Sequence, residues 1–335
     1  MGLVDALARP MKALRISVTD RCNFRCPYCM PREAFGAEFR FLPREEILRF
    51  EEILRLARVF VELGVEKVRL TGGEPTLRRG LPDLVAGLVR LPGLREVTLT
   101  TNGSLLAGLA RPLKAAGLAR LTVSLDSLDP DRFQANADTT VTLDQVLAGL
   151  EAARDAGFQG TKLNCVLRRG VNDADILPLA GFARDQGYTL RFIEYMDVGT
   201  CNGWRLDAVV PAAEVAGIIA RKWPIERFRK DAPNCVAQHW RYLDGAGEVG
   251  LIASVTEPFC AGCDRARLSA DGSLYTCLFA AEGLDLKGFL RAGASDADLA
   301  ALLAARWKRR DDRYSELRSA ATAALPRAEM FHLGG

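Results

Sequence analysis

The sequence has little histidine, no long apolar run and almost no net charge. Histidine occurs only as His239 and His332, which disfavours His-based catalytic triads, two-histidine zinc sites and histidine general bases. No apolar run reaches the roughly 18 residues that a membrane-spanning helix needs, and the segment from Met1 to Met11 lacks the long apolar stretch of a signal peptide. We therefore expect a cytoplasmic protein whose chemistry comes from a cofactor.

Charge is nearly balanced, with 45 basic residues against 42 acidic ones and a net charge of +3. This balance gives no reason to expect a nucleic acid or a membrane surface as a partner, so any anion-binding site must be local. The 335 residues are 49% hydrophobic and 26% charged, which is typical of a globular protein with a full core.

Cysteine, by contrast, is plentiful. The chain has nine cysteines, and six of them fall into two tight clusters. Because the cytosol keeps thiols reduced, such clusters indicate metal ligation or catalysis rather than disulfides.

Short β-rich runs alternate with segments that carry apolar residues at helical spacing. Among the helical segments are Pro43 to Leu63, Thr142 to Ala156 and Asp173 to Gln186. The six predicted strands are Arg15 to Val18, Lys67 to Leu70, Glu96 to Thr100, Arg120 to Leu125, Thr161 to Val166 and Thr189 to Tyr195. Strands that alternate with helices predict a parallel sheet.

The two faces of these strands differ. One parity is apolar and should meet the helices: Leu14, Ile16, Val18, Val68, Leu70, Val97, Leu99, Leu121, Val123 and Leu125. The other is polar on five successive strands: Arg15, Ser17, Thr19, Arg69, Thr71, Gly73, Thr98, Thr100, Asn102, Thr122, Ser124, Asp126, Lys162 and Asn164. A doubly wound sheet buries both faces, so a polar face favours a barrel or partial barrel that holds a polar ligand.

The pattern changes near Cys235. A hairpin is predicted from Gln238 to Tyr242 and from Val249 to Ser254, around a Gly-rich turn, and the region from Ser295 to Ala324 is predicted to be helical. We therefore divide the chain into a barrel domain, residues 1–230, and a C-terminal domain, residues 231–335.

The first cysteine cluster follows the first strand as Cys22-Asn-Phe-Arg-Cys26-Pro-Tyr-Cys29. Three thiolates leave one iron of a four-iron cube open, and the amino and carboxylate groups of S-adenosylmethionine can fill that position. A structural zinc knuckle would need a fourth ligand, and neither Cys nor His lies near. This spacing predicts a 4Fe-4S cluster.

The second cluster is Cys260-Ala-Gly-Cys263, followed by Cys277. It fits either a second 4Fe-4S cluster or a zinc ribbon completed by Cys235 or His239. The isolated Cys165 and Cys201 are interpreted as buried small hydrophobes or idle thiols.

Basic residues are predicted to form a phosphate-binding pocket. Arg265 and Arg267 occupy alternate positions beside the second cysteine cluster, and Arg15, Arg69 and Lys162 lie on the polar strand face. Unpaired charges on such a face would be costly, so an anion is the expected partner.

The first cysteine loop and the Gly72-Gly73-Glu74-Pro75 segment resemble the radical S-adenosylmethionine superfamily. Arg191-Phe-Ile-Glu-Tyr-Met196, the spacing of Cys260, Cys263, Arg265, Arg267 and Cys277, and the terminal Gly334-Gly335 narrow the resemblance to the GTP 3',8-cyclase family of molybdenum cofactor biosynthesis. This resemblance implies an incomplete, TIM-like (βα)6 barrel closed by a C-terminal domain with a second 4Fe-4S cluster.

The resemblance also assigns residues and partners. It places Tyr28, Gly73, Ser124 and Met196 at S-adenosylmethionine, places Arg15, Arg69, Thr100, Lys162, Arg191, Arg265 and Arg267 at GTP, and makes Cys260, Cys263 and Cys277 ligands of the second cluster. The implied reaction joins C3' of the GTP ribose to C8 of guanine. The implied partners are a flavodoxin- or ferredoxin-type reductant and the cyclic pyranopterin monophosphate synthase that receives the product; whether the chain forms a homodimer stays open.

Two other readings remain. A radical S-adenosylmethionine enzyme that modifies peptides can carry additional cysteine clusters, and its basic residues would then bind carboxylates. A zinc-stabilised binding module without catalysis would explain the cysteines but not the Gly-Gly-Glu-Pro segment on a polar-faced barrel.

Overall fold

The computed structural model describes residues 2–228, 236–319, 322 and 325–334. Its centre is a run of six parallel strands in chain order: β1 (Ala13–Ser17), β2 (Lys67–Thr71), β3 (Glu96–Thr101), β4 (Arg120–Ser124), β5 (Lys162–Leu167) and β6 (Thr189–Glu194). Each begins and ends within two residues of the bounds predicted from the sequence. The expected βα barrel architecture is confirmed.

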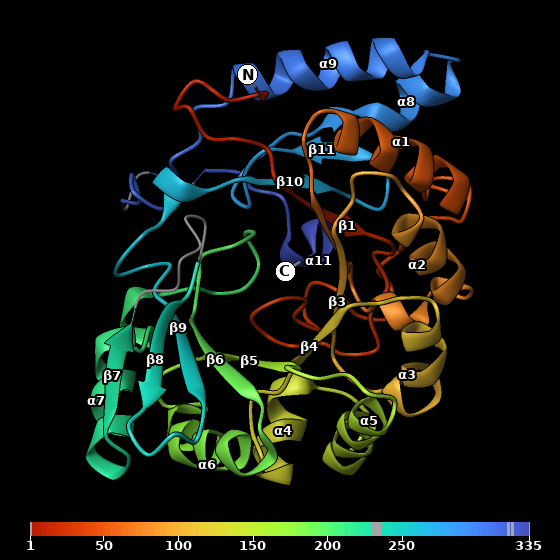
Figure 1. Ribbon diagram of the computed structural model, residues 1–335. Helices are drawn as coiled ribbons and strands as arrows, with labels where there is room; N and C mark the ends of the chain where they lie inside the picture. Colours follow the sequence, from red (N-terminus) through yellow and green to blue (C-terminus); the bar gives the residue numbers. More distant parts are fainter. Residues whose placement is uncertain (1, 229–235, 320–321, 323–324, 335) are drawn as a thin grey trace.

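Helices connect these strands and cover the outside of the curved sheet (Figure 1). They are α1 (Phe50–Glu62), α2 (Leu81–Val89), α3 (Leu106–Ala115), α4 (Pro130–Ala137), α5 (Leu143–Asp155), α6 (Ile176–Gln186) and α7 (Ala212–Lys222). Local sequence defines their ends: Thr142 and Gln145 form a capping box at the start of α5, and Gly187, at a φ of 71°, ends α6.

The predicted apolar parity of the strands forms the core with these helices. Leu14, Ile16, Leu70, Leu99 and Val123 are at most 1% exposed and belong to one continuous hydrophobic cluster with residues of the helices. The opposite face of the strands is therefore left to line the interior of the barrel.

The C-terminal region continues the same sheet at both ends, an arrangement that the sequence did not indicate. β9 (Glu248–Ile252) pairs parallel with β6, and β10 (Arg265–Leu268) pairs parallel with β1. The remaining strands are antiparallel to these two or to each other: β7 (Ile225–Phe228), β8 (Gln238–Tyr242), β11 (Ser273–Tyr275) and β12 (Leu284–Asp285). The predicted hairpin corresponds to β8 and β9 and is confirmed.

The last helices of the described chain are α8 (Leu286–Arg291), α9 (Asp296–Lys308) and α11 (Met330–Leu333). Among the residues that the structure describes, there are also four short 3-10 turns: Pro75–Leu77, Asp173–Asp175, Leu206–Ala208 and Cys260–Gly262. Figure 1 shows α8 beside β11, α9 next to α8 and α1, and α11 inside the ring of strands.

The prediction of helix from Ser295 to Ala324 was wrong for residues 309–319. α9 ends at Lys308, and residues 309–319 form turns and extended chain. The physical reason is Arg310, whose side chain is buried and bonded to Asp5 and to the carbonyl oxygens of Cys263 and Thr276. Those bonds direct the backbone away from the helix axis.

Within the described ranges, none of the helices combines the length and the apolar character that crossing a bilayer requires.

Candidate active site

The first three cysteines lie on the loop that leaves β1. Arg25 folds this loop, because its Nη1 donates to the carbonyl oxygen of Cys22 (2.8 Å) and its Nε to that of Phe35 (2.8 Å). The backbone N–H of Cys29 donates to the carbonyl oxygen of Cys26 across 2.9 Å, so these two residues form a tight turn. The chain itself therefore gathers three thiols on one short loop.

These thiols influence one another electrostatically. Burial raises the pKa of Cys22 to about 12, with a further contribution from the carboxylate of Glu74. Burial also raises the pKa of Cys26 and of Cys29, and the neighbouring thiols of the loop raise both further. Thiols of this kind release their protons when a metal centre binds them, so the loop fits an iron-sulfur ligand set.

Across the described residues, no three His, Cys, Asp or Glu side chains are arranged as ligands of a single metal ion. A single zinc ion draws its ligands to about 2 Å from one point. A four-iron cube instead binds each thiolate through a different iron, so its ligands need not converge on one point.

The Gly-Gly-Glu-Pro segment after β2 is bonded to the backbone just ahead of the cysteine loop. The N–H of Gly73 donates to the carbonyl oxygen of Thr19 (2.7 Å), and the N–H of Glu74 to that of Arg21 (2.8 Å). A Cβ on Gly72 would lie 2.5 Å from the oxygen of Thr19, and one on Gly73 would lie 2.2 Å from the oxygen of Arg21. Both glycines are therefore required by the approach of the two backbones.

Glu74 fixes this segment to the end of β3. Its buried carboxylate accepts hydrogen bonds from the N–H of Thr76 (3.0 Å), the hydroxyl of Thr101 (2.7 Å) and the N–H of Asn102 (2.7 Å). Burial raises the pKa of Glu74 despite these bonds. The segment is thus held from both sides. The contact of Gly73 with S-adenosylmethionine stays a prediction.

The other residues assigned to S-adenosylmethionine lie at the ends of parallel strands. The hydroxyl of Tyr28 donates to Asp126 Oδ2 across 2.8 Å. Asp126 lies two residues after Ser124, which is the last residue of β4. Burial raises the pKa of Asp126 to about 6. Met196, half-buried, follows β6. Because the carboxyl ends of parallel strands meet at one edge of a sheet, these residues share the edge that carries the cysteine loop.

Three arginines stand side by side on three adjacent strands. Arg15 on β1 is the register partner of Arg267 on β10 and of Arg69 on β2. Burial lowers the pKa of Arg15, and the positive charges of Arg267, Arg265, Arg69 and Arg191 lower it further. Burial likewise lowers the pKa of Arg69 and of Arg267 to about 10. Such a concentration of like charge is stabilised when an anion binds.

A hydrogen-bonded network spans the polar face from β2 to β6. Arg69 Nη1 donates to the hydroxyls of Thr100 (3.1 Å) and Thr122 (3.2 Å). Arg191 Nη2 donates to the same Thr122 hydroxyl (3.3 Å), and its Nε donates to Asn164 Oδ1 (2.9 Å). These bonds confirm that the polar parity forms one continuous face.

Lys162 and Gly250 complete this face. Lys162 on β5 is the register partner of Thr122 on β4 and of Thr189 on β6. Gly250 on β9 is the partner of Arg191, and a Cβ there would lie 3.0 Å from Arg191 Cγ. Because Gly250 has no side chain, the Arg191 side chain can lie against the backbone of β9.

The second cysteine set lies beside the same row of arginines. Cys260 begins a 3-10 turn, and Cys263 follows that turn and leads into β10. Cys277 follows β11, the antiparallel partner of β10. Arg265 Nη2 donates to Cys263 Sγ across 3.4 Å. Although burial alone would raise it, the charges of Arg265 and Arg310 lower the pKa of Cys263 to about 7, whereas burial raises that of Cys277 to about 11.

Of the two predicted completions of a zinc ribbon, His239 is engaged elsewhere. His239 lies on β8 opposite Gly250, its ring packs against Phe228 with centroids 5.8 Å apart, and its Nδ1 lies 3.7 Å from Glu248. Cys235 falls outside the described residues.

The C-terminal tail reaches the arginine row. Arg267 Nη1 donates to the carbonyl oxygen of Gly334 across 3.0 Å. Gly334 has a φ of 70°, and a Cβ on it would lie 2.1 Å from Thr71 Cγ2 at the end of β2. Gly334 therefore occupies a position that only glycine fits, while Gly335 lies outside the described residues.

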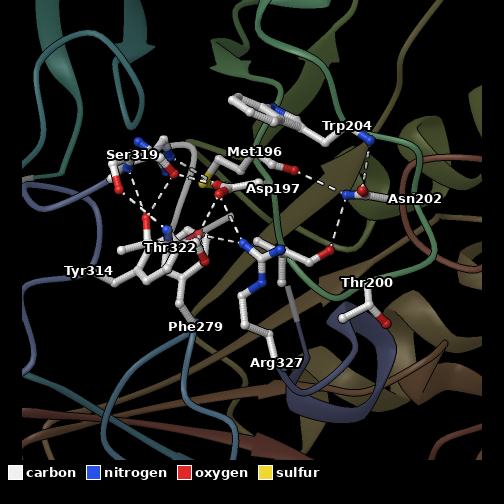
Figure 2. Close-up of polar contacts among 12 residues, drawn as sticks. Met196, Asp197, Thr200, Asn202, Trp204, Phe279, Tyr314, Ser319, Thr322 and Arg327 are labelled. Carbon is white, nitrogen blue, oxygen red and sulfur yellow. Dashed lines mark hydrogen bonds and ion pairs between the residues drawn. The ribbon is translucent and has the colours of Figure 1, made fainter. Parts of the chain in front are cut away.

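A buried ionic cluster ties the segment ahead of this tail to the loop after β6. Asp197, 1% exposed, accepts hydrogen bonds from the hydroxyl of Tyr314 (2.6 Å), Arg318 Nε (3.0 Å) and Arg327 Nη1 (2.9 Å). Figure 2 shows Tyr314 and Arg327 converging on Asp197, next to Met196. The C-terminal segment is thus anchored beside a residue assigned to S-adenosylmethionine.

Two of the remaining cysteines have different surroundings. Cys165 is fully buried in the core, as expected of a small hydrophobe. Cys201 is not an idle thiol, because its Sγ donates to Glu329 Oε2 across 3.0 Å. Burial and Cys22 are the main causes of the raised pKa of Cys29, and Cys201 and Glu329 raise that pKa further. Cys201 therefore lies between the tail and the first cysteine loop.

Two regions of the chain match known families. Residues 16–183 match the Radical SAM superfamily, and residues 188–316 match Molybdenum Cofactor Synthesis C. The protein named GTP 3',8-cyclase of Acidothermus cellulolyticus is 58% identical over 319 residues, which cover 94% of this chain and 88% of that protein. The chain belongs to the GTP 3',8-cyclase family.

Other members of the GTP 3',8-cyclase family agree over the full chain. The Xanthomonas axonopodis pv. citri protein is 49% identical over 99% of this chain and 98% of its own length, and the Staphylococcus carnosus protein is 44% identical over 99% of each. Among solved structures, Streptococcus suis SuiB bound to S-adenosylmethionine superposes with a TM-score of 0.60 at 16% identity over 93% of this chain and 68% of that one, which shows a shared fold.

Membership of the GTP 3',8-cyclase family decides between the readings that the sequence left open. A non-catalytic zinc module does not account for the match to the Radical SAM superfamily, and the relatives at 44 to 58% identity are named as nucleotide cyclases rather than peptide-modifying enzymes. The division at residue 230 lies in the undescribed segment 229–235 and stays a prediction.

Several residues that shape the site were not assigned roles from the sequence. Thr122, Asp126 and Asn164 lie on the predicted polar parity, so the strand alternation could have identified them. Asp197 and Glu329 carry no such signal, because their partners are distant in the sequence: Asp197 bonds Arg327, and Glu329 bonds Thr200 and Cys201.

Proposed function

We propose that this chain is a radical S-adenosylmethionine enzyme that converts GTP to (8S)-3',8-cyclo-7,8-dihydroguanosine 5'-triphosphate, the first step of molybdenum cofactor biosynthesis. The observation that carries the proposal is the row of Arg267, Arg15 and Arg69 inside the barrel. A triphosphate offers the dense negative charge that such a row requires, and guanidinium groups bind phosphate oxygens through paired, charge-assisted hydrogen bonds.

Two 4Fe-4S clusters are part of this proposal. Cys22, Cys26 and Cys29 would hold the first, and Cys260, Cys263 and Cys277 the second. When bound, the first cluster supplies the electron that cleaves S-adenosylmethionine into methionine and the radical that starts the reaction. The thiols of both sets, grouped by the chain itself, support this assignment.

The remaining residues position the reactants. Tyr28, Gly73, Ser124 and Met196 would bind S-adenosylmethionine at the edge that carries the first cysteine loop. Arg15, Arg69, Thr100, Lys162, Arg191, Arg265 and Arg267 would bind GTP on the polar face. Because both sets share one barrel interior, the bound molecules would face each other, and a fixed triphosphate would keep the ribose aligned for hydrogen abstraction.

The enzyme would act as a lyase in the cytoplasm. It would take its electrons from a flavodoxin- or ferredoxin-type protein and pass its product to cyclic pyranopterin monophosphate synthase. A radical centre has to be shielded from water and side reactions, and the tail at Gly334, seated inside the ring beside Arg267, supports such a shielded site.

The proposal is tested by turnover without oxygen. The reconstituted enzyme is incubated with GTP, S-adenosylmethionine and dithionite, and the nucleotide product and 5'-deoxyadenosine are quantified by mass spectrometry. We expect both products with GTP and no cyclised product with CTP. Formation of 5'-deoxyadenosine together with unchanged GTP would overturn the cyclase assignment while leaving the radical chemistry in place.

A further inference from the structure

The second cysteine set is bordered by a buried ionic network that neither the reaction nor the substrate site uses. Its first member is Arg310, whose side chain is 1% exposed. Arg310 Nη1 donates to the carbonyl oxygen of Cys263 (2.8 Å), and its Nε donates to the carbonyl oxygen of Thr276 (3.0 Å). Thr276 directly precedes Cys277, so one guanidinium group fixes the peptide groups beside two of the three cysteines.

The second member of the network is Arg9, which bonds the backbone of the third cysteine, Cys260. Its side chain is 3% exposed, and its Nη1 donates to the carbonyl oxygens of Cys260 (2.9 Å) and Asp312 (2.8 Å). Arg9 and Arg310 together therefore hold the carbonyl groups of Cys260, of Cys263 and of Thr276, the residue that precedes Cys277.

Asp5 joins the two arginines. Its fully buried carboxylate accepts a hydrogen bond from Arg9 Nε (2.6 Å) and another from Arg310 Nη1 (2.9 Å). Trp307 adds to the network from α9, since its indole Nε1 donates to the carbonyl oxygen of Arg9 (3.2 Å) and its ring lies under the Arg310 guanidinium group at 4.6 Å. The arginines are thus locked in place and cannot adjust freely.

Burying an arginine side chain is costly in free energy, and the hydrogen-bonding capacity of Arg9 is not filled by its protein partners. Arg9 Nη2 is buried and finds no hydrogen-bond partner among the residues that the structure describes. A binding site for a group held by thiolates, which are negatively charged, would use this positive charge.

We propose that Arg9 and Arg310, bridged by Asp5, are positioning residues for the metal centre held by Cys260, Cys263 and Cys277. They fix the backbone at each cysteine so that the three thiols are arranged before the centre binds, and they offset its negative charge. This inference rests on the proposed second cluster. Partners that orient ligands from behind commonly change metal affinity by about 10- to 100-fold when they are lost.

Two substitutions of Arg310 test the inference. R310M removes both the charge and the hydrogen bonds, whereas R310K keeps the charge but cannot reach the carbonyls of Cys263 and Thr276 and the carboxylate of Asp5 with one planar fork. The matched control is R55M, because Arg55 also bonds a carboxylate, Asp296, and a carbonyl, that of Ala294, but touches no cysteine.

The primary readout is iron, measured per chain after anaerobic reconstitution and then followed as its release to a ferrous chelator. We expect wild type and R55M to hold about eight irons. In R310M the iron of the second centre should be absent or released about tenfold faster or more, and R310K should release it about tenfold faster. Both variants should keep the first centre, seen as 5'-deoxyadenosine formed from S-adenosylmethionine.

Each outcome decides a separate point. Wild-type protein with only about four irons would overturn the second cluster itself, before any variant is considered. If wild type holds about eight irons, the R310K variant decides the next point. R310K with about eight irons and the wild-type release rate would overturn the positioning role of Arg310, even if R310M proved insoluble. Faster release in R55M to the same degree would show that the effect is general destabilisation and would equally overturn the proposal.

Discussion

Arg267 Nη1 donates a hydrogen bond to the carbonyl oxygen of Gly334 across 3.0 Å, and thereby joins strand β10 to the C-terminal tail. The same arginine stands next to Arg15 in the row that we assign to the triphosphate. One guanidinium group therefore contributes both to the charge of the substrate site and to the position of the tail.

The substitution R267A should weaken GTP binding while both clusters still assemble. Loss of a charged hydrogen bond removes about 1.5 to 3 kcal/mol, which corresponds to an about 10- to 150-fold higher Kd. Equilibrium dialysis with GTP measures the change, and R241A on β8, whose Arg241 pairs with Glu226 at the surface, serves as the control. Unchanged GTP affinity together with lost iron would show instead that Arg267 is structural.

The substitution G334A should lower the yield of cyclised product by about tenfold to a hundredfold, because small misplacements in a site are costly. A Cβ at this position would overlap Thr71 Cγ2, and the φ of 70° is unfavourable for alanine. Iron content should not change.

The matched control for G334A is G293A. Gly293 has a comparable φ of 90°, but a Cβ there would meet nothing within 4 Å. Product per 5'-deoxyadenosine, measured under anaerobic turnover, separates the two variants. Equal product yield from both would mean that crowding at Thr71 has no role.

The substitution D197N should destabilise the fold by about 3 to 5 kcal/mol, because it leaves the buried Arg318 and Arg327 without their carboxylate. Urea unfolding under anaerobic conditions gives the free energy. D207N is the control, since Asp207 pairs with Arg205 on the surface and should be replaceable without measurable change. If D197N unfolds at the same urea concentration as D207N, the ionic cluster does not anchor the C-terminal segment.

Glu52 should make the free energy of unfolding depend on pH in the acid range. Its buried carboxylate bonds Arg291 Nε (2.8 Å) and the N–H of Arg49 (2.7 Å), and chiefly the bond from Arg291 lowers the pKa of Glu52 from 4.5 to about 2. A lowered pKa means that the folded state favours the charged form, so this stability is complete above pH 4.5 and is lost as the pH falls toward 2.

The substitution E52Q should therefore cost about 2 to 3 kcal/mol near pH 7, and the difference from wild type should shrink steadily below pH 4.5. Urea unfolding at a series of pH values measures it. D298N is the control, because Asp298 caps α9 in the way that Glu52 caps α1 but is exposed. A difference between wild type and E52Q that stays constant from pH 7 to pH 3 would contradict the assigned pKa.

The cysteine sets should behave as two independent centres. C26S should lose about four of eight irons and all formation of 5'-deoxyadenosine, whereas C277S should lose about four irons and retain 5'-deoxyadenosine formation. C165S, which alters a buried thiol in the core, should leave the iron content unchanged. Normal 5'-deoxyadenosine yield from C26S would refute the assignment of the first cluster.

The sequence predicted those parts of the fold that repeat locally. Strand alternation depends only on neighbours along the chain, and it correctly separated the face of Leu14 and Ile16 from the face of Arg15. The spacing of Cys22, Cys26 and Cys29 likewise identified a thiol loop, because all three ligands come from one segment.

What could not be predicted depends on contacts between distant segments. Nothing near Asp5 or Arg9 in the sequence shows that they border a cysteine set that begins at Cys260. The early end of α9 has the same origin, since Arg310 is helical by local propensity but is bonded to distant partners. The role of Gly72 and Gly73 in backbone contact was also hidden, because a pair of glycines gives no information about what approaches it.

The pairing of β1 with β10 has a consequence for how the chain folds during synthesis. Arg15 and Arg267 are neighbours in the sheet but are separated by about 250 residues, so the ribosome needs roughly 10 to 50 s to deliver the second strand after the first. Until then β1 is an open edge with an apolar face, a state that can pair with other chains. Overproduction at low temperature or with added chaperones should therefore raise the soluble yield more than stabilising substitutions in the core would.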